Sequence, residues 1–82
     1  MVKEFSYRIE YLVDKESGQV SATIPELGHV SSFGDSFAEA EAAVREAALG
    51  YLEVLARSNQ EIPRPAFSTE GTYLKLFVPM AA

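Results

Sequence analysis

The sequence predicts an α+β fold in which a single layer of sheet packs on one helix, with the elements in the order β-β-β-α-β. Three patterns support this prediction. Apolar and polar residues alternate over residues 5–13 and 20–24, an apolar stripe with helical spacing crosses residues 37–57, and a further strand-like pattern, apolar on both faces, covers residues 72–78. A chain of 82 residues has room for one small core, so we expect a single domain over residues 1–82.

The first two strands are predicted to form a hairpin. The polar segment between them ends in Gly18, which can adopt the left-handed conformation that a tight turn needs. The apolar phase of the two strands is Phe5, Tyr7, Ile9, Tyr11, Val13, Val20, Ala22 and Ile24. Because a one-residue slip would turn the second strand's apolar set toward water, we expect all of these residues on one face.

A corner and a short third strand should follow the hairpin. Pro25 lacks a backbone donor and is therefore expected at a strand end, with residues 26–29 forming the corner. Residues 30–33 then form the third strand, and Gly34 and Asp35 turn the chain toward the helix.

Residues 37–57 are predicted to be helical. Ser36 and Glu39 have the spacing of a capping box, in which the Ser36 hydroxyl bonds the Glu39 N–H and the Glu39 carboxylate reaches back to the Ser36 N–H. The expected buried stripe is Phe37, Ala40, Val44, Ala47, Ala48, Tyr51 and Leu55. A leucine at position 47 should therefore overpack the helix against the sheet and cost about 1 to 3 kcal/mol. Asn59 suits a left-handed residue beyond the helix, which Pro63 prevents from continuing.

The fourth strand, residues 72–78, has apolar residues on both faces, which indicates that both faces are covered. We expect the sheet order 3-2-1-4, with the last strand parallel to the first through a right-handed crossover. The exposed edge at the third strand and any uncovered apolar side of the fourth predict self-association as a dimer or tetramer.

Charge and composition exclude several classes of protein. The net charge of −5 counts against direct nucleic-acid binding, which needs clustered Lys and Arg, and favours a basic protein partner. The chain has no cysteine, so disulfides, Cys-based zinc sites and thiol nucleophiles are excluded. Because no apolar run is long enough to span a bilayer and no signal peptide precedes the first strand, we expect a cytoplasmic protein without membrane contact.

The residues that could carry chemistry have simpler structural interpretations. A metal-dependent nuclease would need converging carboxylates, and Glu10, Asp14 and Asp35 fit a strand face, a turn and a helix start instead. His29 is the only histidine, and the nearby serines fit a turn. We therefore expect no catalytic residues, no metal and no cofactor.

Several short segments occur in a distinctive order along the chain. They are Pro25-Glu26-Leu27, Gly34-Asp35-Ser36, Glu39-Ala40, Tyr51-Leu52-Glu53 and Ile62-Pro63. Over residues 5 to 65 this order resembles the HicB-like antitoxin family of bacteria and archaea. The chain departs from the family at Gly28-His29, where family members usually carry Pro-Gly.

The resemblance implies a non-enzymatic antitoxin, with a fold similar to a truncated ribonuclease H-like fold. Such a protein would neutralise a small basic HicA-like toxin that cleaves mRNA by covering its active face. We expect the partner to contact Glu26, Gly28, His29, Asp35 and Glu39, where the end of the sheet meets the helix N-terminus. The DNA-binding segment that family members often carry is not expected here. The alternative is a solitary oligomeric scaffold or small-ligand sensor that keeps this fold without a toxin.

Overall fold

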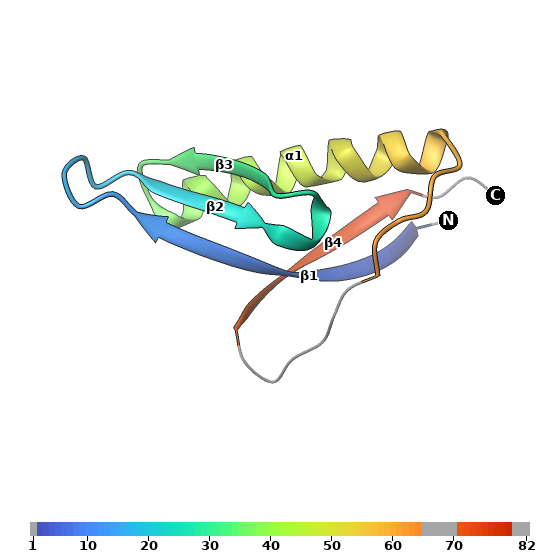
Figure 1. Cartoon of the computed structure of the whole chain (residues 1–82), viewed down its shortest axis with the longest axis horizontal. Coiled ribbons are helices and arrows are strands. Elements are labelled where there is room, and N and C mark those ends of the chain that lie inside the picture. The colour runs from blue at the N-terminus through green and yellow to red at the C-terminus, as the bar shows by residue number, and fades with distance from the viewer. Residues whose placement is uncertain (1, 65–70, 80–82) are drawn as a thin grey trace.

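The computed structural model describes residues 2–64 and 71–79. Its elements are β1 (Val2–Val13), β2 (Val20–Ile24), the 3₁₀ helix η1 (Pro25–Leu27), β3 (Val30–Gly34), α1 (Phe37–Arg57) and β4 (Thr72–Pro79). The strands form one sheet in the order β3-β2-β1-β4, and α1 lies along one face of it (Figure 1). The predicted α+β class, the element order and the sheet order are therefore confirmed. The ribonuclease H-like description stays an expectation.

The hairpin register matches the prediction. Tyr11 pairs with Ala22 and Val13 with Val20, so the apolar sets of β1 and β2 share a face. Val20, Ala22 and Ile24 are all buried there. The long strand β1 joins the two halves of the sheet, because its residues 10–13 pair with β2 and its residues 2–9 pair with β4.

The direction of β4 is opposite to the one predicted. β4 runs antiparallel to β1, from Thr72 opposite Ile9 to Pro79 opposite Val2. α1 starts directly after β3 and runs back toward the N-terminal end of β1, where a short connection would have produced a parallel strand (Figure 1). The connection over residues 58–71 is instead long enough to return along β1, since each extended residue spans about 3.3 Å. The Tyr7 hydroxyl, which donates to the Pro63 carbonyl at 2.7 Å, marks its path beside β1.

The predicted bounds of α1 are confirmed, but its buried face is rotated from the predicted stripe. The buried residues are Ala40, Val44, Ala48, Leu52 and Leu55. Phe37, Ala47 and Tyr51 are exposed. A leucine at position 47 would therefore not overpack α1 against the sheet, and that prediction is wrong. Leu52, which the predicted stripe does not include, is fully buried. The positive φ of 53° at Asn59 confirms the predicted left-handed residue.

β4 is an edge strand with one covered face. Leu74, Leu76 and Val78 are buried beneath α1, whereas Phe77 is 57% exposed on the opposite face. Within the chain, therefore, β4 is not covered on both sides as its sequence indicated. None of the helices in residues 2–64 and 71–79 has the length and apolarity needed to cross a membrane.

Candidate functional site

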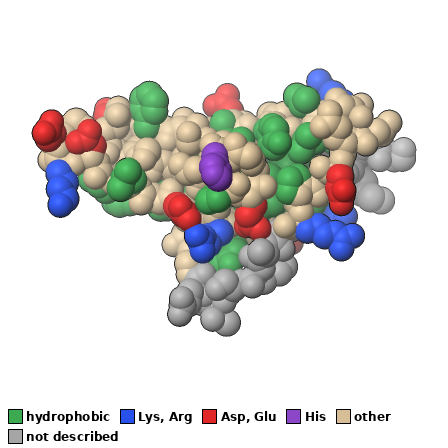
Figure 2. All heavy atoms as spheres, in the orientation of Figure 1, with side chains coloured by type: hydrophobic (Ala, Val, Ile, Leu, Met, Phe, Trp, Pro, Cys, Tyr) green, Lys and Arg blue, Asp and Glu red, His purple; other side chains and the backbone are tan. Residues whose placement is uncertain are grey.

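A tight corner between β2 and β3 carries three of the candidate residues. η1 begins at Pro25, and the fully buried Leu27 anchors it to the core. Gly28 and His29 then both take left-handed conformations, with φ of 64° and 62°. This conformation is uncommon for a residue with a side chain, and it leaves His29, the one histidine of the chain, exposed at the tip of the corner (Figure 2).

The third candidate in the corner, Glu26, bonds to β1. β2 ends at Ile24, and Glu26 lies in η1, which follows it. Its Oε1 accepts a hydrogen bond from the Arg8 backbone N–H at 3.4 Å. The Arg8 guanidinium pairs with Glu10, and this hydrogen bond raises the pKa of Arg8. Two carboxylates therefore bond to Arg8, that of Glu26 to its backbone and that of Glu10 to its guanidinium.

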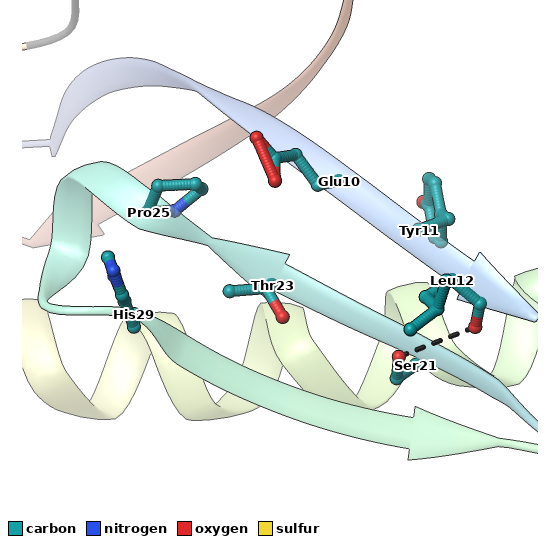
Figure 3. Close-up of a pocket in the computed structure, with 7 residues that line it drawn as sticks. All are labelled: Glu10, Tyr11, Leu12, Ser21, Thr23, Pro25 and His29. Atoms are coloured by element: carbon teal, nitrogen blue, oxygen red, sulfur yellow. Dashed lines mark hydrogen bonds between the residues drawn. The ribbon is translucent and has the colours of Figure 1, made fainter.

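A shallow groove of ≈ 540 Å³ lies next to the corner, and it was not predicted from the sequence (Figure 3). It is lined by Glu10, Tyr11, Leu12, Ser21, Thr23, Pro25 and His29. Glu10 pairs with Thr23 and Leu12 with Ser21 across the two strands, in the opposite phase to the buried residues of the hairpin. The groove therefore lies on the sheet face away from α1, which we call the outer face. Leu12, an exposed leucine within the polar phase of β1, is the sequence signal that could have revealed it.

The other two candidates, Asp35 and Glu39, belong to the start of α1. The Ser36 hydroxyl accepts from the Glu39 N–H at 3.1 Å, which confirms the predicted N-cap. Glu39 Oε2 accepts from the Asp35 N–H at 2.8 Å rather than from the Ser36 N–H that the sequence indicated. The Glu39 carboxylate is thus engaged within the chain.

Gly34 is required by the close approach of the first turn of α1 to the end of β3. A Cβ at this position would lie 2.6 Å from the Glu39 Cβ and 2.7 Å from the Ala40 backbone nitrogen. The Gly34-Asp35-Ser36 segment therefore serves to join β3 to the helix without a longer loop.

The structure divides the five candidate residues into two groups instead of bringing them together. Glu26, Gly28 and His29 lie before β3, and Asp35 and Glu39 lie after it. The five residues of β3 lie between the two groups and alone span roughly 13 Å, at about 3.3 Å per residue. Of the five candidate residues, only His29 lines the groove.

The carboxylates considered for a metal site lie apart in sequence and role. Glu10 pairs with Arg8, and Asp14 accepts from the backbone N–H groups of Glu16 and Ser17, which lowers the pKa of Asp14. Within residues 2–64 and 71–79, no three His, Asp or Glu side chains are grouped so that they could hold a metal ion.

Comparison with known proteins supports the fold. The structure is similar to the N-terminal domain of the antitoxin HicB from Burkholderia pseudomallei, with a TM-score of 0.65 and 22% sequence identity. The alignment covers 98% of this chain and 100% of the HicB domain. No protein-family model matches the chain, and no curated protein matches its sequence.

Proposed function

We propose that this chain is an antitoxin-type binding module that neutralises a small basic HicA-like toxin by covering its mRNA-cleaving face. The observation that carries the proposal is the fold, which matches the HicB N-terminal domain over 98% of the chain. The net charge of −5 is consistent with it, because a protein that holds RNA is basic and would be attracted to an acidic partner.

The outer face supplies the proposed contact surface. Glu10 and Glu26 provide carboxylates beside the groove, and His29 projects at its corner (Figure 3). Leu12 and Phe33 are 72% and 64% exposed. Leu12 on β1 and Phe33 on β3 each pair with Ser21 on β2, so all three share the outer face. Apolar anchors beside paired charges are typical of the centre and rim of a protein interface.

Covering the active face of a toxin would require only a few kinds of contact from the outer face. A lysine or arginine of the toxin would ion-pair with Glu10 in competition with Arg8, whose own pair is half exposed and therefore weakly stabilising. The apolar pair would exclude water, and charge complementarity would speed the encounter. Asp35 and Glu39 would contact the partner only if it also reached the far end of β3.

Capture of the partner from the native lysate tests this proposal. The tagged chain should retain a small basic protein at low salt and less of it at high salt, because screening weakens pairs between exposed charges. A Glu10→Gln/Glu26→Gln variant should retain at least about tenfold less, whereas Glu53→Gln, which lies on α1, serves as the control. Equal retention by both variants would show that the outer face is not the contact surface.

The solitary scaffold or sensor predicts a different outcome of the same experiment. A chain without a toxin would recover only copies of itself, and salt would leave that result unchanged. A small-ligand sensor would instead use the groove, whose lining residues carry one imidazole, one carboxylate and three hydroxyl groups, including the phenol of Tyr11.

A further inference from the structure

One side of the molecule, which we call the β3 side, is formed by uncharged residues. It consists of strand β3 (Val30–Gly34) and five residues on the adjoining flank of α1, namely Ala43, Ala47, Gly50, Tyr51 and Val54. Ala47 is exposed, and Tyr51 and Val54 are 37% and 57% exposed. In a chain with 19 charged side chains, 12 acidic and 7 basic, such a surface needs an explanation.

Two contacts fix the direction in which this flank of α1 faces. The Arg45 side chain reaches β4, where Nη1 donates to the Lys75 carbonyl at 2.8 Å. Tyr51 lies toward β3 instead, because its hydroxyl is 3.7 Å from the position that a Cβ on Gly28 would take. Ala47 and Val54 are four residues before and three residues after Tyr51, and therefore share its flank.

The two edges of the sheet differ in how they are protected. At β4, Arg45 donates a hydrogen bond to the Lys75 backbone carbonyl. The Lys75 side chain pairs with Glu4 and places a charge on that strand. Such charges discourage pairing with another strand. The residues of β3 are Val-Ser-Ser-Phe-Gly, without a charge or a proline, and an edge strand of this kind is a template for strand addition.

We propose that a second copy of this chain docks on the β3 side, pairing β3 with β3 antiparallel and α1 with α1 across a two-fold axis. The absence of charge selects this occupant. Two copies with a net charge of −5 repel each other, so they can meet closely only where neither is charged, whereas a basic toxin would select acidic groups. The proposal does not rest on the proposed toxin binding, which uses the outer face, although Phe33 and His29 border both surfaces.

The geometry of β3 is self-complementary. Full overlap of two antiparallel copies of Val30–Gly34 centres the axis on Ser32 and keeps both helices on the same face of a continuous sheet. That register places the His29 end of each strand beside the Asp35 end of the other, so a hydrogen-bond donor meets a carboxylate at both ends. The small Ala43 and Ala47 side chains then allow the two helices to approach closely.

Light scattering on the full chain tests the proposal. Wild-type protein should be a dimer, whereas Ala47→Glu should place a like charge from each copy at the interface and weaken self-association by at least about tenfold. Ala42→Glu adds the same charge away from the β3 side and should remain dimeric. Ala47 is exposed, so the variant should fold, which circular dichroism would verify. Val54→Glu is the second variant if Ala47→Glu fails to fold.

Hydrogen exchange provides the second measurement. Amides of β3 should exchange more slowly in the wild-type dimer than in the Ala47→Glu monomer, because strand pairing covers the free edge. A monomeric wild type, an Ala47→Glu variant that associates as strongly as wild type, or unchanged β3 exchange would each overturn the proposal.

Discussion

Single residues show where the backbone leaves no choice of side chain. Gly34→Ala should destabilise the fold by about 1 to 3 kcal/mol, since the added methyl group meets Glu39 and Ala40 at distances that require the helix to move. The measurement is the free energy of unfolding in urea. Gly50→Ala is the matched control, because a Cβ there has no neighbour within 4 Å. Within α1 this control should stabilise the protein by about 0.5 to 1 kcal/mol, and equal losses in both variants would contradict the account.

Tyr7 provides a prediction about pH. Burial, with Glu26 nearby, raises the pKa of Tyr7 to about 12. The folded chain therefore holds the phenol proton more tightly than the unfolded chain, whose tyrosines titrate near about pH 10. Stability from this group is complete below pH 10 and is lost as the pH rises through 12.

The matched variant is Tyr7→Phe, which keeps the ring but loses the hydrogen bond to Pro63. It should be less stable than wild type by about 1 kcal/mol at neutral pH, yet lose less stability between pH 10 and 12. Thermal unfolding across this pH range would check both effects. Parallel pH profiles of the two proteins would show that Tyr7 does not control the alkaline limit.

At the scale of elements, the start of α1 depends on one side chain. Ser36→Ala removes the acceptor of the Glu39 N–H and should cost about 0.5 to 2 kcal/mol. Ser36→Asp keeps an acceptor at the same position and should lose little stability. Urea unfolding would separate the two variants, and a loss as large for aspartate as for alanine would exclude the capping explanation.

The sequence predicted the existence of most elements better than it predicted their faces. The hairpin was predictable because only one register of the two strands buries the apolar residues of both. The buried face of α1 was not, because alanine fits both exposed and buried positions. Ala47 and Ala48 therefore did not indicate which face of the helix is buried. Leu52 was left out of the predicted stripe although its side chain is fully buried.

At the scale of the whole molecule, the predictions failed where long connections decide the arrangement. The direction of β4 depends on the segment over residues 58–71, whose length permits either direction. The five candidate contact residues do not lie together, because residues 26–29 and 35–39 are close in sequence yet lie at opposite ends of β3. Their contact with a partner stays a prediction. The groove joins two strands, so only their pairing reveals it.

The two proposed partners use two different surfaces, the outer face for the toxin and the β3 side for a second copy. The Ala47→Glu variant should lose self-association but keep the salt-dependent retention of a basic partner, since the outer face is unchanged. The Glu10→Gln/Glu26→Gln variant should show the reverse. Light scattering and partner capture on the same four preparations, with wild type and Glu53→Gln as controls, would check this. Loss of both properties in either variant would mean that the two surfaces are not separate.

The most direct test of neutralisation is a titration of RNA cleavage. The captured basic protein, freed of this chain, should cleave RNA, and adding the chain back should abolish cleavage at equal molar amounts. The Ala47→Glu variant should inhibit as well as wild type does. Cleavage that persists in the presence of excess chain, with binding confirmed in the same mixture, would contradict the antitoxin-type function.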